Sequence, residues 1–338
     1  MRNLNVGIIG AGRIGRVHAQ NLAYHVRGVN VVAVADVMLE AAQKLAADLQ
    51  IPAVYGDPQP IFQDKNVDAV VICSSTDTHA SLIEEAALAG KHIFCEKPIA
   101  LDLSRIDRAL SAVDKAGVKL QIGFNRRFDP SFKRVHEMVA AGEIGQPHIL
   151  RITSRDPAPP PISYVKVSGG IFLDMAIHDF DMARYVVGSE VEEVYAAGNV
   201  LVDPAIGEAG DVDTAVITLR FANGALGVID NSRKAVYGYD QRVEVFGSAG
   251  MVVVANKTPD NATRSDASGV HSALPLYFFV ERYTEAYILE MQDFVQAVRE
   301  NKQPPVTGMD GRIPVVMGFA AKKSLAEHRP VKLSEITA

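Results

Sequence analysis

The chain has no tryptophan and only two cysteines, Cys73 and Cys95, among its 338 residues. So few cysteines, with no CxxC pair, argue against a disulfide framework and a structural zinc site, and they suit reduced thiols. No stretch approaches the ~20 apolar residues that a membrane-spanning helix needs. Acidic residues outnumber basic ones, and a net charge of -6 leaves no basic footprint for nucleic acid or an anionic membrane.

What is present describes an ordinary globular protein. Hydrophobic residues make up 48% of the chain and charged residues 22%, and the length suggests about two domains. The N-terminal residues Met1 to Leu4 run straight into an apolar strand and contain no signal-peptide pattern. We therefore expect a cytoplasmic protein.

A glycine-rich turn follows the first predicted strand, Val6 to Ile9. Its sequence, Gly10-Ala11-Gly12-Arg13-Ile14-Gly15, opens a segment with apolar residues at helical spacing. Strand, tight turn and helix N-terminus are the context that the dinucleotide fingerprint G-x-G-x-x-G requires. We predict that this loop, including Arg13 and Ile14, binds the cofactor, with backbone amides facing a pyrophosphate.

The second strand, Val29 to Ala35, ends in Asp36, roughly 20 residues beyond the glycines, as the fingerprint expects. A carboxylate there accepts hydrogen bonds from ribose hydroxyls and repels a 2′-phosphate. Because Val37 follows instead of an arginine, NAD is favoured over NADP. The alternative is that Asp36 merely caps a helix starting at Val37.

Strands and helices then alternate as far as a strand at Lys119 to Phe124, which predicts right-handed crossovers and a doubly wound parallel sheet, a Rossmann domain over residues 1–123. The loop after the Cys73 strand lies on the same edge as the glycine loop. Its residues Thr76 and His79 are therefore candidates for lining the cofactor. Thr76 or Thr78 as a simple N-cap is the alternative.

The short apolar run from Lys91 to Cys95 delivers Glu96 and Lys97 to the carboxyl end of a buried parallel strand. Ligands of doubly wound sheets bind at that end. Pro98 stops the strand, because it has no N–H and holds the preceding residue in extended geometry. This position favours a functional Lys97, and the alternative is a solvated lysine in a turn.

The second half, residues 124–338, changes texture, because strand patterns follow one another through hairpin turns. Asp213 to Phe221 alternates, Asn223-Gly224 indicates a type I′ hairpin, and Leu226 to Ser232 returns. We predict an α+β domain with an open, mostly antiparallel sheet, one face of it covered by helices near residues 131–141, 175–187, 285–300 and 310–326. Its other face has to be buried or polar, which suggests a homo-oligomer, a dimer or tetramer.

The densest polar group of this half runs from Gly169-Gly170 to Asp179. If a helix begins near Asp174, then Asp174 and His178 stand at i and i+4 on one face. A carboxylate that holds one imidazole nitrogen leaves the other for proton transfer. The alternative makes Asp174 an N-cap and His178 a half-buried core residue. A metal on His178, Asp179 and Asp181 is not expected, because these positions point around the helix.

Together these motifs resemble the Gfo/Idh/MocA family of nicotinamide-dependent sugar and polyol oxidoreductases, over essentially the whole chain. The resemblance rests on the glycine fingerprint, Glu96-Lys97-Pro98, Gly169-Gly170, Asp174 with His178, Gly123 to Asp129, and Tyr237 to Asp240. It implies NAD-dependent oxidation of a ring hydroxyl, inositol being the expected substrate. Another polyol or sugar, or a non-catalytic sensor of NAD or sugar, is the alternative.

The resemblance also implies roles for particular residues. Lys97, Asp174 and His178 would form the catalytic group, and Glu96 would position Lys97 or contact the cofactor ribose. Lys97, Asp174 and His178 would also contact the substrate, whose other hydroxyls would be approached by Arg126, Asp156 and Tyr237. Close relatives can carry an amide where Asp156 aligns, and a proline-rich run follows it here.

Overall fold

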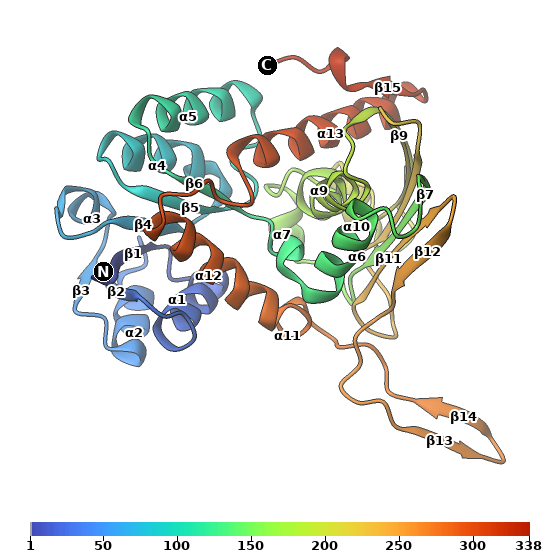
Figure 1. Ribbon diagram of the computed structural model, residues 1–338, viewed down its shortest axis with the longest axis horizontal. Coiled ribbons are helices and arrows are strands. Elements are labelled where there is room, and N and C mark those ends of the chain that lie inside the picture. The colour runs from blue at the N-terminus through green and yellow to red at the C-terminus, as the bar shows by residue number, and fades with distance from the viewer. Residues whose placement is uncertain (1) are drawn as a thin grey trace. The chain divides into compact units, whose positions relative to one another are not determined.

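The computed structural model describes residues 2–338, which form two compact units (Figure 1). The first unit comprises the chain through Phe128 together with Glu285–Val315 and Ala338. The second comprises Asp129–Thr284 and Val316–Thr337. The division predicted from the sequence was residues 1–123 and 124–338, with a last helix that can pack back on the first domain. Both compact units are assembled from separate stretches of the chain.

The first unit is built on a six-stranded sheet in the order β3-β2-β1-β4-β5-β6, with all neighbouring strands parallel. This strand order is that of the doubly wound dinucleotide-binding fold, so the predicted Rossmann sheet is confirmed. The edge strand β3 was not predicted, because its three residues are too few to show a pattern. The strands are β1 Leu4–Ile9, β2 Val29–Ala35, β3 Ala53–Tyr55, β4 Ala69–Ile72, β5 His92–Glu96 and β6 Leu120–Gly123.

Helices cover both faces of this sheet (Figure 1). One layer contains α1 (Arg13–Tyr24), α2 (Leu39–Leu49) and α12 (Thr284–Arg299); the other contains α4 (Thr76–Leu88) and α5 (Leu103–Ala116). The short helices of this unit are α3 (Gln59–Gln63) and η1 (Asn125–Phe128).

The position of α12 corrects a prediction. Its apolar residues Met291, Phe294 and Val295 join the core formed by β1, β4 and α1, so it does not cover the second sheet. A helical pattern shows which face of a helix is apolar, but it does not say which sheet that face is buried against.

The long helix α13 (Gly308–Glu327) belongs to both units. In its first half Gly311 packs closely on the first unit, where an added Cβ would lie 2.7 Å from Ile99. In its second half the Ser324 hydroxyl accepts a hydrogen bond of 2.9 Å from the amide of Ala196 in the second sheet. The second half of α13 thus belongs to the second unit, and its first half packs on the first unit.

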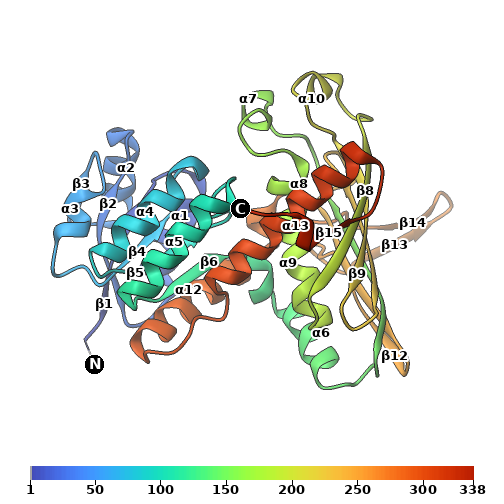
Figure 2. The same cartoon turned by 90° about the horizontal axis from the view of Figure 1, so that it is seen from above.

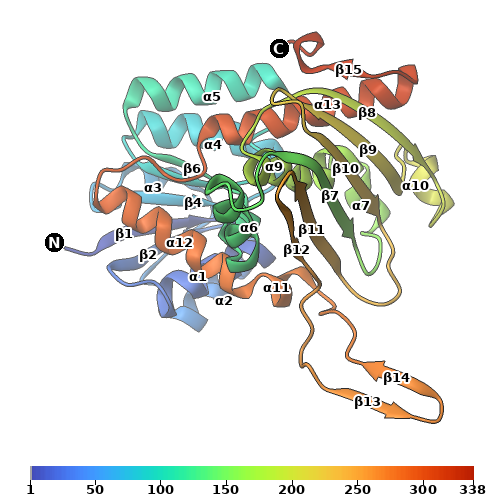
Figure 3. The ribbon, with the colours of Figure 1, turned by 45° about the vertical axis from the view of Figure 1, so that its right-hand side comes forward.

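The second unit contains a seven-stranded sheet in the order β12-β11-β7-β10-β9-β8-β15. Its neighbours pair antiparallel except β7 and β10, which confirms the predicted mostly antiparallel sheet (Figure 3). The strands are β7 Pro147–Arg155, β8 Val191–Asn199, β9 Thr214–Phe221, β10 Leu226–Ser232, β11 Asp240–Gly247, β12 Gly250–Val254 and β15 Val331–Lys332.

One face of this sheet is covered by α6 (Pro130–Ala140) and α9 (Ala176–Val187), as Figure 2 shows. We call the opposite side the outward face. A separate hairpin, formed by β13 (Thr263–Asp266) and β14 (Gly269–Ser272), extends away from the sheet (Figure 3). The remaining elements are α7 Ile162–Val165, α8 Ile171–Asp174, α10 Pro204–Glu208, α11 Phe279–Arg282 and η2 Leu333–Glu335.

The turn between β9 and β10 forms a hairpin as predicted, but the predicted turn type is wrong. A type I′ turn needs positive φ at both central residues, and here only Gly224 has it, at +89°. The Gly224 amide instead donates to the Phe221 carbonyl at 2.9 Å, and the Asn223 side chain accepts from the Ala225 amide at 3.1 Å. The Asn223 carboxamide therefore stabilises a longer turn.

Two simple features of composition are resolved by the structure. Cys73 and Cys95 are buried free thiols, and burial raises the pKa of both. Among residues 2–338, no helix combines the length and the apolar character needed to cross a membrane.

Candidate active site

Every cofactor residue predicted in the first unit follows the carboxyl end of a parallel strand. The glycine loop follows β1, Asp36 follows β2, and the loop with Thr76 and His79 follows β4. Glu96 ends β5 and Lys97 comes next. Because these ends share one edge of the sheet, the structure brings the predicted cofactor residues to the same edge, where such folds bind their ligands. Arg126, in η1 after β6, lies at that edge too.

The glycine loop fits a dinucleotide phosphate. Gly10 has φ +99°, and an added Cβ would lie 2.6 Å from the Cys73 carbonyl carbon. A Cβ on Gly15 would overlap the Gly10 carbonyl oxygen. At Gly12 a Cβ meets nothing within 4 Å, and no side chain caps the N-terminus of α1. Amides at the start of α1 can therefore meet an anion that approaches the open side of the loop.

Both oxygens of Asp36 hold backbone amides. Oδ2 accepts from Ala11 at 2.6 Å and Oδ1 from Met38 at 2.7 Å. The alternative reading as a helix cap is only partly right, because α2 begins later, at Leu39. The carboxylate is thus fixed beside the glycine loop, and its contact with a ribose stays a prediction.

The loop after β4 is tied down by its own side chains. Ser75 precedes α4, so neither Thr76 nor Thr78 is the N-cap, which corrects that alternative. The Thr78 hydroxyl donates to the Ser75 carbonyl at 2.7 Å. His79 is buried, with Nδ1 2.8 Å from the Pro98 carbonyl and Nε2 3.0 Å from the Ser74 carbonyl, and desolvation lowers its pKa.

Through these contacts His79 joins this loop to the chain just after Lys97. Contacts of Thr76 and His79 with the cofactor stay predictions. Lys97 is half-buried, and the Lys97–Pro98 peptide is cis. Glu96 turns into the core of the unit, where its Oε1 hydrogen-bonds to His18 Nε2 at 2.7 Å.

In the second unit the predicted helix around Asp174 is interrupted. Asp174 is the last residue of α8, and α9 begins at Ala176, so the Asp174 N-cap alternative is wrong. Gly170, at φ +80°, leaves space for Asp211, whose carboxylate accepts from the Ile171 amide at 2.9 Å. The long-range cap by Asp211 starts α8 early, which a local pattern could not predict.

Arg233 is a site residue that was not predicted from the sequence. This side chain is only 3% exposed, and its guanidinium lies 2.9 Å from Asp174 Oδ2 and 3.4 Å from Asp156 Oδ2. The Tyr164 hydroxyl donates to Asp174 Oδ1 at 2.9 Å, and partial burial and this carboxylate raise the pKa of the phenol. Arg233 thus brings together Asp156 and Asp174, two residues that were predicted from the sequence. The alternation in β10, in which Ile229 is buried, places Arg233 on the buried face and could have indicated it.

Tyr237 does not join this group. Its hydroxyl donates to Asp240 at 2.6 Å and accepts from Arg155 at 3.1 Å. Arg155 pairs with Asp230 on the outward face, and these residues border a cavity of about 420 Å3. Neighbouring strand residues point to opposite faces, so the hydroxyl of Tyr237 lies on the side away from Asp156. Its role toward substrate stays a prediction.

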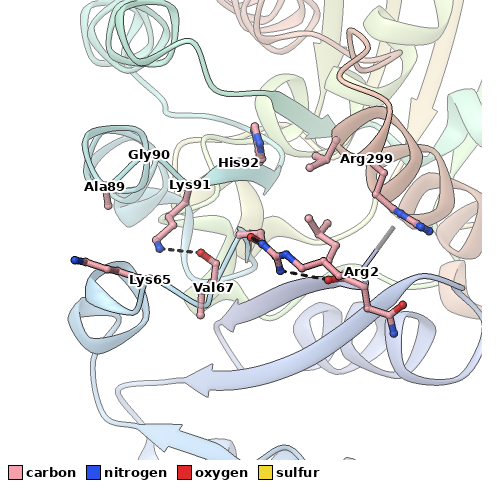
Figure 4. Close-up of a pocket in the computed structure, with 12 residues that line it drawn as sticks. Arg2, Lys65, Val67, Ala89, Gly90, Lys91, His92 and Arg299 are labelled. Atoms are coloured by element: carbon pink, nitrogen blue, oxygen red, sulfur yellow. Dashed lines mark hydrogen bonds and ion pairs between the residues drawn. The ribbon is translucent and has the colours of Figure 1, made fainter.

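Another cavity lies within the first unit (Figure 4). It measures about 660 Å3 and is lined by the beginnings of β1 and β5, at the amino edge of the parallel sheet. Its Lys91 ammonium donates to the carbonyls of Asp64 and Val67, at 2.6 and 2.8 Å. Its Arg2 guanidinium pairs with Asp68. Both cations are bound to groups of the first unit itself, and we do not include the cavity in the candidate active site.

Among residues 2–338 one side-chain group has the spacing of a metal site, and it is His18, Glu96 and Glu290. The group weighed from sequence, His178 with Asp179 and Asp181, is not among the candidates. Asp179 is fully buried and accepts a hydrogen bond from Asn231 at 2.8 Å.

Comparison with known proteins agrees with this geometry. The family profile described as oxidoreductase family, NAD-binding Rossmann fold, matches residues 4–124, and the profile of the GFO/IDH/MocA C-terminal domain matches residues 132–253. A myo-inositol 2-dehydrogenase of Thermotoga maritima is 53% identical over 98% of this chain and 99% of its own length. The chain belongs to the GFO/IDH/MocA oxidoreductase family.

Two other family members extend the comparison. An inositol 2-dehydrogenase of Rhizobium meliloti is 45% identical over 97% of this chain and 98% of its own. A crystal structure of scyllo-inositol dehydrogenase from Lactobacillus casei, with bound NAD(H) and scyllo-inositol, has a TM-score of 0.92 at 30% identity, covering 98% and 100% of the two chains. The first unit of this protein is therefore an NAD-binding Rossmann domain, and the protein is an oxidoreductase.

Proposed function

We propose that this protein is an NAD-dependent dehydrogenase that oxidises a ring hydroxyl of an inositol to the ketone. The observation that carries the proposal is the 53% identity, over nearly the full length of both chains, to a protein named myo-inositol 2-dehydrogenase. Lys97, Asp174 and His178 supply the functional groups that alcohol oxidation requires.

The chemistry divides into a hydride and a proton. Bound NAD supplies the acceptor for the hydride that leaves the carbinol carbon. His178 takes the hydroxyl proton on a ring nitrogen, which suits an imidazole whose unperturbed pKa is ~6.5. The Lys97 ammonium hydrogen-bonds the same oxygen and stabilises its developing negative charge. Alcohol and NAD thus become ketone, NADH and a proton.

Asp174 acts by orienting His178, the residue four positions later across the junction of α8 and α9. Its carboxylate is itself held by the Tyr164 hydroxyl and the Arg233 guanidinium. This support from two further side chains favours one fixed carboxylate position. A fixed carboxylate keeps the imidazole in one tautomer.

A hydroxyl-rich ring needs many fixed donors and acceptors and little apolar surface. In the proposal Arg126 and Asp156 provide these from the ends of β6 and β7, together with the catalytic group. Asp36 selects NAD, because its carboxylate repels the 2′-phosphate of NADP. The two hydrogen bonds that the Asp36 carboxylate accepts from backbone amides fix its position and support this role.

Turnover of a substrate panel, followed by NADH absorbance, tests the function. We expect reduction of NAD with myo-inositol or scyllo-inositol, and slower reduction of NADP. A rate with an aldose and none with either inositol would assign the protein to the family's other substrates. No turnover of any polyol, with NAD binding intact, would indicate a sensor.

We also propose that a second copy of the chain covers the outward face of the second sheet. Large apolar side chains on that face are well exposed, including Val216 at 49%, Phe246 at 45% and Val253 at 54%. Phe246 pairs across the strands with Ile149, which is 42% exposed, and Ile149 pairs with Leu226, which is 50% exposed, so these side chains of β11, β7 and β10 form one apolar row. A contiguous apolar area of this kind marks an interaction surface.

A further inference from the structure

A carboxyl group without a partner lies in the core of the NAD-binding unit. Glu290, on α12, is fully buried, and among residues 2–338 neither of its side-chain oxygens has a hydrogen-bond partner. Glu96 and His18 lie close to it, and the three groups offer atoms that all lie within 4.8 Å of one another.

The surroundings of this cluster are apolar and aromatic. The His18 ring packs edge-on against Phe94 at 4.9 Å and Tyr287 at 5.6 Å. Burial, and then the charge of Glu96, raise the pKa of Glu290 well above its ordinary value. Two ionised carboxylates side by side in such a site repel each other, so the cluster requires a proton or a metal ion.

The geometry decides between the two. His18 Nε2 lies 2.7 Å from Glu96 Oε1, a direct hydrogen bond. Ligands of one zinc ion, each about 2.1 Å from the metal, stand about 3.4 Å apart in a tetrahedral site. The imidazole and the Glu96 carboxylate bind each other too closely to share an ion, which leaves the proton.

We propose that Glu290 is a neutral carboxylic acid at neutral pH, next to an ionised Glu96, and that this pair positions the end of β5 from which Lys97 projects. The cluster joins α1, which follows the glycine loop, to β5 and α12. The Gln121 side chain of β6 donates to the Glu290 carbonyl at 3.0 Å. Gly123 leaves space for Glu96, because an added Cβ would lie 3.0 Å from Oε2.

The protonation state of Glu290 sets an upper pH limit for this arrangement. When Glu290 ionises, its negative charge repels the carboxylate of Glu96, the residue directly before Lys97. The titratable groups that face the cluster come from five places in this unit. They are His18 from α1, Glu96 and Cys95 from β5, Cys73 after β4, His79 from α4, and Tyr287 from α12. Both thiols are buried and have raised pKa values, so they stay neutral through the same range.

Infrared spectroscopy of the full-length protein with NAD tests the proton directly. We expect the carbonyl band of a protonated carboxylic acid at pH 7, its loss in Glu290→Gln, and its persistence in Glu285→Gln, an exposed position on the same helix. Glu96→Gln removes the neighbouring charge, so the band should then disappear at a lower pH than in the unmodified protein. A spectrum without the band, or stoichiometric bound metal that Glu290→Gln loses, overturns the proposal.

The positioning of Lys97 rests on the proposed function and has its own readout. In Glu290→Gln we expect kcat at pH 7 within about threefold of the unmodified enzyme, and an alkaline limb of the kcat profile shifted to higher pH. An unchanged limb with the infrared band lost overturns the positioning role alone. If Glu290→Gln fails to fold, the pH titration of the band in the unmodified protein and in Glu96→Gln still decides the proton. The infrared result needs no substrate, so failure of the inositol assay leaves it intact.

Discussion

Arg233 and Asp174 form an ion pair of 2.9 Å, with the guanidinium almost completely buried between Asp174 and Asp156. The Arg233 guanidinium therefore compensates the negative charge of Asp174, the residue proposed to orient the base His178. In the proposed mechanism this guanidinium limits how strongly the Asp174 carboxylate favours a protonated His178.

Arg233→Gln tests this balance. Without the guanidinium the Asp174 charge favours imidazolium, so the acid limb of the kcat/KM profile should move to higher pH, and kcat at pH 7 should fall at least tenfold. Loss of one partner of a buried pair should also destabilise the protein by about 3–5 kcal/mol. Arg233→Lys keeps the charge and should leave the acid limb nearly in place, and a limb that moves equally in both variants contradicts the charge argument.

Lys97→Ala tests the proposed role of the ammonium. We expect kcat to fall by orders of magnitude while NAD binding, measured by calorimetry, is largely retained. The physical reason is that the missing charge stabilises the alkoxide character of the transition state and not the bound cofactor. Unchanged turnover would remove Lys97 from the mechanism.

Asp36→Ser should weaken the preference for NAD over NADP, because it removes the negative charge that is proposed to face the ribose. Asp36→Asn is the matched control, since its side-chain oxygen can still accept from one of the two amides that Asp36 holds. We expect the ratio of kcat/KM for the two cofactors to drop in both variants. An unaltered ratio would show that Asp36 does not read the ribose.

Glu290 also predicts how stability changes with pH. Its folded pKa is raised above the unfolded value of ~4.3, so its contribution is fully present below that value and declines as pH rises toward the folded pKa. As pH rises through that window, the free energy of unfolding of Glu290→Gln should therefore increase relative to that of the unmodified protein, by up to about 1.4 kcal/mol per pH unit. Urea unfolding at several pH values measures it, and a difference independent of pH would contradict it.

Association through the outward face predicts a smaller particle when that face is charged. Phe246→Asp places a carboxylate beside the exposed Ile149 of the neighbouring strand and should lower the mass measured by light scattering at micromolar concentration. Lys234, exposed near the same sheet but not apolar, offers the control Lys234→Ala. A monomeric unmodified protein would end the proposal.

Local sequence patterns predicted much of the NAD-binding unit. Apolar runs of four to seven residues, glycines at the first turn and a carboxylate after β2 follow from backbone rules that act over a few residues. The sequence alone therefore determined the parallel sheet, the edge that carries the cofactor residues, and the positions of Lys97 and Asp36.

Only the tertiary structure decided which distant residues meet. Arg233 approaches Asp174 from β10, Asp211 starts α8 from a loop 40 residues later, and Glu290 joins Glu96 although 194 positions separate them. No periodicity encodes such partners. The partners of a buried charge are fixed by the packing of whole elements, because desolvation penalises every arrangement that leaves the charge without a compensating group.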